Sequence, residues 1–389
     1  MWNRRRLLKT LRALAIAPPG IKNSVSRSNY VWIGSCANAS DHNGIYGAQF
    51  DPHTGKLSAP TLRARTRRPS YFAILPGETA VLYAVNELSH GEGAVAAFAI
   101  SSAGDRLSPL NHVPSRGDGP CYLSVRAQTR TVYTANYHGS SVSVFPVLPL
   151  EEGALGPAIQ YLDFKNTRFG KPGPDPRQVT PHPHSVTWSP DHRFLIVNDL
   201  GNDSIDVFSV RPNDGCLSSQ GPVRCQRPPA SGPRHLAFHP RRPWAYGISE
   251  LNSTLQQYQW VEQGASAKLE PLGSEISTLA DATTGAGNAA AELVIAADGR
   301  FLYASNRGDD SLTVFSVDAD SGALRFRQRV PSGGHTPRYF LLDPSQRWLL
   351  CCNNGSDAVT VFARNPRDGS LEGPRSTIAI ECPKFCLYA

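Results

Sequence analysis

Leu302-Tyr303-Ala304-Ser305-Asn306-Arg307 is one copy of a short pattern that decides the fold of this 389-residue chain. In each copy a few mostly apolar residues lead to Asn or Ser, and a polar residue follows. The other copies are Leu82–Glu87, Val132–Tyr137, Leu195–Asp199, Tyr246–Glu250 and Leu350–Asn354. The Asn or Ser position recurs every 47 to 62 residues. An internal period in this range predicts a repeat architecture.

Each copy lies within a unit of four short elements. A segment with proline followed two residues later by an aromatic residue, such as Pro337-Arg338-Tyr339, precedes most copies by about 12 to 16 residues. A segment that alternates apolar and polar residues, such as Leu312-Thr313-Val314-Phe315, comes after. A Gly-x-Leu element such as Gly322-Ala323-Leu324 provides the fourth strand. Four short strands in about 50 residues are typical of a β-propeller blade.

The two ends of the chain predict how the ring closes. Tyr30–Ser35, Gly44–Phe50 and Gly55–Leu57 supply the second, third and fourth strands of a blade that has no first strand. Pro383-Lys384-Phe385-Cys386 has the form of the missing strand. Six complete blades and one shared blade predict an all-β, seven-bladed propeller over residues 29–389, whose closure removes exposed sheet edges. The 33 Gly and 32 Pro residues agree with a turn-rich fold.

Composition and motifs argue against several classes of function. No apolar run approaches the roughly 18 residues that span a bilayer, so we expect no membrane insertion. The net charge is +7, but seven of the 39 basic residues lie before Ser28, where there are no acids. No basic stripe with aromatics follows, so we expect no nucleic-acid partner. The chain has neither a Gly-rich phosphate loop nor a Gly-x-Ser-x-Gly elbow, which argues against nucleotide-binding enzymes and serine hydrolases. We expect no cofactor.

The first 28 residues form a separate basic arm. Asn3–Lys9 resembles a twin-arginine export signal, whereas Arg12 interrupts the apolar region and Pro18 follows the Ala15–Ala17 site. We therefore expect a cytoplasmic, monomeric protein, with export through this leader as the alternative. The eight cysteines show no CxxC pair and no zinc-site spacing, so we expect mostly reduced thiols.

Polar residues occupy two columns of the repeat that should converge at the centre of the ring. The first strand of each blade lines the central channel. Its column, the residue after each Pro or its equivalent, consists of Ser70, Cys121, His184, Arg234, Glu292, Arg338 and Lys384. The position after the Asn or Ser column adds Glu87, Tyr137, Asp199, Glu250, Arg307 and Asn354.

Charges at strand positions are costly to bury unless they are paired. One interpretation is therefore a structural network of paired charges, formed by Glu250, Glu292 and Asp199 with Arg234, Arg307 and Arg338. The other is a site for an anion, because the first column has three fixed cations and one carboxylate. Histidine beside carboxylates also suits acid–base chemistry. His182 and His184 should share one strand face, but a metal would need a third ligand from another blade, and we predict no metal.

Several segments resemble the propeller-type 6-phosphogluconolactonases. These are Gly232–Pro240, Ala291–Leu293, Asp298–Gly308, Pro183–Val186 with Asp199–Gly201, Thr336–Phe340, and Ile33–Ser35 with Gly44–Tyr46. The resemblance covers roughly residues 29 to 389. The family also contains the fungal muconate-lactonizing enzymes. The sequence departs from the family at Val294, where a His is common, and in its N-terminal arm.

The resemblance implies an enzyme that hydrolyses a small anionic lactone, namely 6-phospho-D-glucono-1,5-lactone of the pentose phosphate pathway. In the muconate branch a His, two Arg and a Glu are considered the active residues. By motif, the catalytic candidates here are His184, Arg234, Glu250 and Arg307. The substrate-binding candidates are His182, Asp199, His235, Glu292, Arg338 and Lys384.

Our mechanistic hypothesis has water attacking the lactone carbonyl after activation by His184 or by a carboxylate, Glu250 or Glu292. Arginines would stabilise the oxyanion and hold the phosphate. Two alternatives stay open. One is a lactone-forming cycloisomerase or another lactonase, and the other is a non-catalytic propeller used as a binding module.

Overall fold

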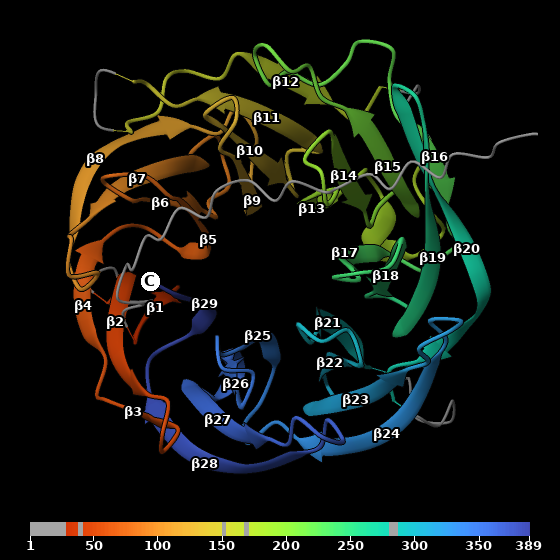
Figure 1. Ribbon diagram of the computed structural model, residues 1–389. Coiled ribbons are helices and arrows are strands. Elements are labelled where there is room, and N and C mark those ends of the chain that lie inside the picture. The colour runs from red at the N-terminus through yellow and green to blue at the C-terminus, as the bar shows by residue number, and fades with distance from the viewer. Residues whose placement is uncertain (1–28, 38–41, 150–152, 167–170, 280–286) are drawn as a thin grey trace, which may run out of the picture.

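The computed structural model describes residues 29–37, 42–149, 153–166, 171–279 and 287–389. Seven antiparallel sheets surround a central channel (Figure 1). This arrangement confirms the seven-bladed propeller predicted from the repeat. The predicted basic arm, residues 1–28, lies outside the described residues. No helix in the described ranges is long and apolar enough to cross a membrane.

The strands fall into four positions, counted outward from the channel. The innermost strands are β29 (Pro383–Tyr388), β5 (Pro69–Leu75), β9 (Pro120–Arg126), β13 (Pro183–Trp188), β17 (Pro233–Phe238), β21 (Ala289–Ile295) and β25 (Pro337–Leu342). The second strands are β1 (Tyr30–Ser35), β6 (Val81–Asn86), β10 (Thr131–Asn136), β14 (Phe194–Asp199), β18 (Trp244–Ser249), β22 (Phe301–Arg307) and β26 (Trp348–Asn353).

The two outer positions complete the blades. The third strands are β2 (Gly44–Asp51), β7 (Ala94–Ile100), β11 (Ser141–Pro146), β15 (Ser204–Ser209), β19 (Thr254–Gln263), β23 (Ser311–Val317) and β27 (Ala358–Arg364). The outermost strands are β4 (Thr61–Arg65), β8 (Leu107–Pro114), β12 (Gln160–Asp163), β16 (Val223–Gln226), β20 (Ser266–Ser277), β24 (Leu324–Pro331) and β28 (Leu371–Ala379). The short elements are β3 (Lys56–Leu57) and the 3-10 helices η2 (Pro176–Gln178) and η4 (Asn354–Ser356).

The second strands form the core because neighbouring blades cover both of their faces. Every residue of β6, β10, β14 and β18 is buried. In the outermost β4, by contrast, exposed and half-buried residues alternate. Tyr83 and Val85 of β6, for example, pack against Val132 and Phe145 of the next blade. This packing is the physical reason for the uninterrupted apolar runs in the repeat.

The C-terminal strand closes the ring as predicted. β29 pairs antiparallel with β1, with Val31 opposite Tyr388 and Gly34 opposite Phe385. β29 also packs against the innermost strands of the blades on either side, β25 and β5. The first blade therefore contains strands from both ends of the chain, and no blade is left with an open side (Figure 1).

The prediction that each Gly-x-Leu element is a fourth strand is wrong in three blades. Leu155 and Leu217 form only isolated bridges, and the outermost strands β12 and β16 begin several residues later. In the first blade the element becomes the two-residue β3, while β4 forms the outer pairing with β2. The element recurs because it forms a contact between blades.

In that contact a tyrosine of one blade donates a hydrogen bond to the glycine carbonyl of the next. Tyr83 Oη donates to Gly153 O at 2.7 Å, and Tyr303 Oη donates to Gly369 O at 2.8 Å. Gly369 has φ +78°, and a Cβ there would lie 2.3 Å from the ring of Phe301. A residue without a side chain is therefore required where this turn meets the neighbouring blade.

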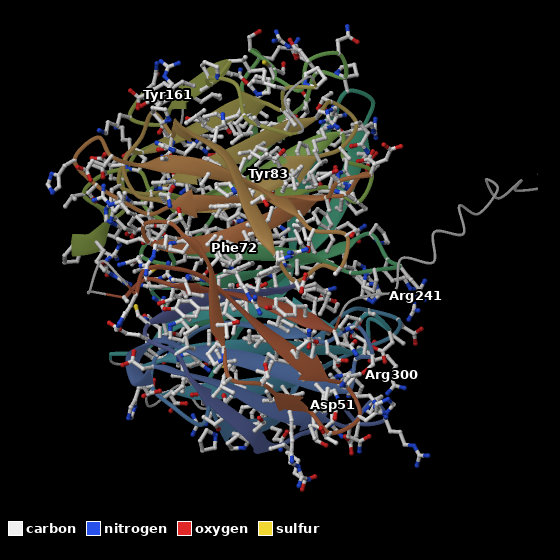
Figure 2. The ribbon with its side chains drawn as sticks, turned by 90° about the vertical axis from the view of Figure 1, so that its left-hand side faces the viewer. Asp51, Phe72, Tyr83, Tyr161, Arg241 and Arg300 are labelled. Atoms are coloured by element: carbon white, nitrogen blue, oxygen red, sulfur yellow. The ribbon has the colours of Figure 1, made fainter. Side chains whose placement is uncertain are left out.

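One face of the disc carries the starts of the inner strands, and the other face carries their ends. In the side view of Figure 2, Asp51, Arg241 and Arg300 lie along one face. Arg241 and Arg300 belong to the turns between first and second strands. Since the inner strands run from one face to the other, residues at the start of each inner strand lie toward the opposite face. Phe72 and Tyr83 lie inside the body of the disc (Figure 2).

Candidate active site

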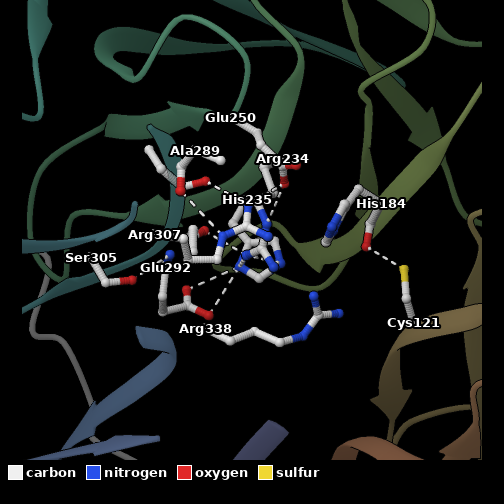
Figure 3. Close-up of polar contacts among 12 residues, drawn as sticks. Cys121, His184, Arg234, His235, Glu250, Ala289, Glu292, Ser305, Arg307 and Arg338 are labelled. Atoms are coloured by element: carbon white, nitrogen blue, oxygen red, sulfur yellow. Dashed lines mark hydrogen bonds and ion pairs between the residues drawn. The ribbon is translucent and has the colours of Figure 1, made fainter. Parts of the chain in front are cut away.

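The carboxylate of Glu250, directly after β18, is surrounded by three arginines. Arg234 Nε and Arg307 Nη2 contact its Oε2 at 2.9 and 2.7 Å (Figure 3). Arg177 Nη1 contacts Oε1 at 2.8 Å. Burial alone would raise the pKa of Glu250, but the positive charges of Arg307, Arg234 and Arg177 lower it to about 2. Glu250 is therefore an anion at neutral pH that holds the arginines in place and is a poor proton acceptor.

Backbone carbonyls of β21 fix the two inner arginines. Arg234 Nη1 donates to Ala291 O at 2.5 Å, and Arg307 Nε donates to Ala289 O at 3.1 Å. The pairing of β21 with β22 is irregular between Ala290 and Leu293, which leaves carbonyls free to accept side-chain donors. Burial, reinforced by Arg307, lowers the pKa of Arg234 to about 10, so it stays a cation at neutral pH.

Arg177 comes from a loop between the third and fourth blades, and the sequence analysis missed it. It lies in η2, where Asp175 accepts from its backbone N–H at 2.8 Å. The neighbouring Gln178 is fully buried and donates to Leu200 O at 2.7 Å. The loop is thus anchored while the Arg177 side chain stays 49% exposed. No repeat position predicts a residue in such an insertion.

Two histidines lie close to this cluster in different states. His235 Nδ1 lies 3.0 Å from both carboxylate oxygens of Glu292. His184 Nδ1 is buried and has no hydrogen-bond partner among the described residues. Burial, then the charges of Arg234 and other cations, lower the pKa of His184 well below 6.5. His184 is therefore neutral at pH 7, with a ring nitrogen available to a ligand. The Cys121 thiol holds the backbone of His184 by donating to its carbonyl at 3.2 Å (Figure 3).

A small cavity of about 10 Å³ lies at the centre of the ring. Its lining consists of Ser70, Tyr71, Cys121, His184, Arg234, His235, Arg338, Tyr339, Lys384 and Phe385. A space of this volume holds about one water molecule, whereas pockets that enclose a whole small molecule usually measure about 300–1,000 Å³. A ligand at the centre of the ring would therefore lie mainly in the channel mouth, with one end directed at this cavity.

Aromatic rings form the floor of the cavity. Tyr71 stacks on Tyr122 with ring centroids 3.9 Å apart, and Phe385 lies 4.1 Å from both Tyr71 and Tyr339. The same four rings line a second cavity toward the other face of the disc. They therefore separate the two cavities. No role for these rings was predicted from the sequence, although each stands two positions after the proline of its inner strand.

The structure brings most of the predicted site residues together. His184, Arg234, His235, Arg338 and Lys384 line the cavity. Glu250 contacts Arg234 and Glu292 contacts His235 in a second layer. Arg307 in turn contacts Glu250.

Two predicted residues lie apart from the cavity. The ring of His182 stacks on Tyr137 at 4.3 Å, and its Nδ1 contacts the Tyr137 carbonyl at 2.8 Å. Asp199 accepts from the backbone N–H groups of His182 and Asn202 at 2.7 and 3.1 Å. Burial raises the pKa of Asp199 to about 7. Both residues stabilise the loop structure around the start of β13.

The predicted network of paired charges is correct for Glu250 and wrong for two other carboxylates. Asp199 contacts backbone amides and Glu292 contacts His235, so neither forms an ion pair with an arginine among the described residues. The carboxylate near Arg338 is Glu87, at 3.6 Å. The described residues contain no cluster of three His, Cys, Asp or Glu side chains that could hold a metal ion.

Comparison with known proteins gives one consistent result. A family model described as "Lactonase, 7-bladed beta-propeller" matches residues 30–387. A 6-phosphogluconolactonase of Bacillus subtilis is 34% identical over 87% of this chain and 93% of its own length. A 6-phosphogluconolactonase of Formosa agariphila is 28% identical over 81% of this chain and 86% of its own. The structure of a periplasmic gluconolactonase of Pseudomonas aeruginosa superposes with a TM-score of 0.81 and 31% identity, covering 92% of this chain and 98% of that one.

The closed ring and its buried centre of arginine, carboxylate and histidine define an enzyme of the propeller type. The chain belongs to the lactonase family of seven-bladed β-propellers. It is a lactone hydrolase.

Proposed function

We propose that this enzyme hydrolyses 6-phospho-D-glucono-1,5-lactone to 6-phosphogluconate, the reaction of the pentose phosphate pathway. The observation that carries the proposal is a cavity in which a neutral, unpartnered His184 faces an excess of fixed positive charge. The name of the Bacillus subtilis relative supports the choice of substrate.

The charge balance of the centre favours an anionic lactone. Among the described residues, five cations, Arg177, Arg234, Arg307, Arg338 and Lys384, face the three carboxylates Glu87, Glu250 and Glu292. This excess of positive charge favours an anionic group such as a phosphate monoester, which carries about −1.5 to −2 at pH 7. Bound phosphate would also offset the positive field that lowers the pKa of His184 and make this residue a better base.

The mechanism begins with water bound between His184 and the lactone carbonyl. His184 accepts one proton as the water oxygen attacks C1, and the carbonyl oxygen becomes an oxyanion stabilised by the guanidinium of Arg234. Collapse of this intermediate breaks the bond between C1 and the ring oxygen. The proton on His184 passes to the departing ring oxygen, which becomes a hydroxyl group, and the new carboxylic acid ionises. Glu250 and Arg307 position Arg234 throughout.

The experiment measures release of 6-phosphogluconate by the purified protein, above spontaneous hydrolysis. We expect the wild type to be active and His184→Ala and Arg234→Ala to lose at least about 100-fold in kcat/KM. His53→Ala, at an exposed position of the first blade, is the matched control and should keep wild-type activity. Near wild-type rates in both site variants would overturn the assignment.

A second candidate substrate is unphosphorylated glucono-1,5-lactone, which the likeness to the Pseudomonas gluconolactonase favours. The same assay with this lactone separates the two. Carboxymuconate as a third substrate tests for a lactone-forming cycloisomerase. A protein with no activity on any of them would be a non-catalytic binding module.

We also propose a cytoplasmic location, where phosphorylated sugars are formed. All eight cysteines are free thiols, which supports a reducing compartment. Fractionation of cells that produce the full chain tests this proposal. Recovery of the protein outside the cytoplasm, lost when Arg4 and Arg5 are replaced by Lys, would favour export through the leader.

A further inference from the structure

One side of the central cavity holds cations with too few partners. Lys384 lies on β29 and lines the cavity, but none of the described residues forms a hydrogen bond or an ion pair with its ammonium group. The charge of Arg338, then burial, lower the pKa of Lys384. The negative charge of Glu87 offsets part of the repulsion from Arg338, but it does not lie within ion-pair distance of the ammonium group.

Arg338, on the neighbouring inner strand β25, is also weakly paired. The contact between its Nη2 and Glu87 Oε2 measures 3.6 Å, longer than a hydrogen bond. Glu87 Oε2 is buried and has no hydrogen-bond partner in the described part of the chain. Arg234 and Arg307, by contrast, have both a carboxylate and backbone carbonyls. Arg234 and Arg307 on one side of the site therefore have more hydrogen-bond and ion-pair partners than Arg338 and Lys384 on the other side.

His184 lies between these two sides. It lines the same cavity as Arg338 and Lys384, and its buried Nδ1 has no partner in the described residues. The buried Nδ1 of His184 and two cations, Lys384 and Arg338, thus face one small space. Buried polar groups are nearly always hydrogen-bonded, so the unpartnered ring nitrogen indicates a polar ligand, and the two cations beside it indicate that this ligand is an anion.

We propose that Lys384 and Arg338 form the subsite for the phosphate group of a phosphorylated sugar lactone. This inference rests on the proposed function and defines how the substrate is oriented in the site. The phosphate lies at the Lys384 side, and the lactone carbonyl lies toward Arg234 and His184. Arg338 supplies a planar pair of donors and Lys384 a point charge, which together suit a phosphate dianion.

The position of Lys384 couples this subsite to the closure of the ring. Lys384 lies on the C-terminal strand, which pairs with β1 at the junction of the two chain ends. Without a ligand, the repulsion between Lys384 and Arg338 opposes the packing of β29 beside β25. A bound phosphate removes that repulsion and connects the closing strand to its neighbour. The ligand should therefore stabilise the whole propeller.

The test measures the melting temperature and the dissociation constant with 6-phosphogluconate, inorganic phosphate and gluconate. Near saturation, at about 100 times Kd, we expect 6-phosphogluconate to raise the melting temperature by about 2–5 °C. Inorganic phosphate should give a smaller rise, and gluconate the smallest. Lys384→Met should weaken binding of 6-phosphogluconate at least about tenfold. The ligand-free variant should melt at or above the wild-type temperature, because an unpaired charge is gone.

The melting temperature of ligand-free Lys384→Met, together with its affinity for 6-phosphogluconate, separates a binding residue from a structural one. A structural lysine would lower the melting temperature when replaced and would leave the affinity for 6-phosphogluconate unchanged, and that outcome overturns the proposal. An equal response to gluconate and 6-phosphogluconate also overturns it. Lys384→Gln, which keeps polarity, gives the same readout if Lys384→Met does not fold. Lys268→Met is the matched control, because Lys268 is half-buried in an outermost strand, away from the cavity, and pairs with Glu270.

Failure of the subsite and failure of the proposed function can be told apart. If the protein hydrolyses no sugar lactone but Lys384-dependent binding of phosphate persists, the proposed function fails and the subsite stands. If the protein hydrolyses the phosphorylated lactone and Lys384→Met leaves KM and kcat unchanged, the subsite fails and the proposed function stands.

Discussion

Replacement of Glu250 by Gln should destabilise the protein by about 3 kcal/mol at neutral pH. The substitution keeps the shape of the side chain and removes the charge that Arg234, Arg307 and Arg177 share. The pKa of Glu250 falls from 4.5 to about 2, and at about 1.36 kcal/mol for each pKa unit this corresponds to about 3 kcal/mol. Breaking a buried ion pair generally costs about 3–5 kcal/mol, which agrees. Arg234, only 2% exposed, loses its carboxylate partner.

The lowered pKa of Glu250 also determines how this loss of stability depends on pH. Because the pKa of Glu250 is lower in the folded state, its contribution is fully present above pH 4.5 and disappears as the pH falls through about 2. At pH 3 less than half of the difference between wild type and Glu250→Gln should remain. Urea unfolding of both proteins, followed by tryptophan fluorescence at pH 7, 5 and 3, measures it.

Two results would refute this argument. One is a difference below about 1 kcal/mol at pH 7, which would mean that solvent and backbone carbonyls satisfy the arginines without Glu250. The other is a large difference that stays constant from pH 7 to pH 3, because a loss unrelated to ionisation would not follow the pKa of Glu250. Asp214→Asn is the matched control, since Asp214 forms an exposed ion pair with Arg211 and should change stability little at any pH.

Three further predictions concern single residues. His184→Ala should lower kcat by about 10²–10⁴-fold, measured by steady-state kinetics, and a loss below tenfold would exclude His184 as the base. Arg177→Ala should cost less than about 1 kcal/mol in urea unfolding, because Arg177 is 49% exposed. It should still lower kcat/KM, because Glu250 loses one of its contacts, and Arg177→Lys should recover part of the activity. Gly369→Ala should destabilise the propeller by about 1–3 kcal/mol, since φ is +78° and the new Cβ would clash with Phe301, whereas an unchanged unfolding midpoint would contradict the role of that turn.

The fold could be predicted from the sequence because each blade repeats the same packing problem. The Asn column shows this most directly. Asn353 Nδ2 donates to Ser332 O at 3.1 Å and to Thr360 Oγ1 at 2.9 Å, which fixes the segment that enters the blade. Asn136 makes equivalent contacts with Ser115 and Ser143. A contact that recurs in several blades leaves a periodic signal, so the number and order of the blades could be read from the repeat.

The candidate site could be predicted only in part because its residues differ from one blade to the next. The first column located His184, Arg234, Arg338 and Lys384 at the central cavity, since every inner strand starts at the channel. Partners could not be assigned, because pairing depends on distances between blades that the repeat does not encode. Arg177 lies in a loop insertion that has no counterpart in the other blades.

The aromatic floor of the cavity affects how substrate and product enter and leave this enzyme. Tyr71, Tyr339 and Phe385 line both the central cavity and the cavity behind it, so their rings lie between the two. A lactone that enters the site from the channel mouth, as proposed, and the product formed from it then pass through the same opening. Slow release of the product would therefore delay binding of the next substrate. The turnover rate would then fall as the concentration of product in solution rises.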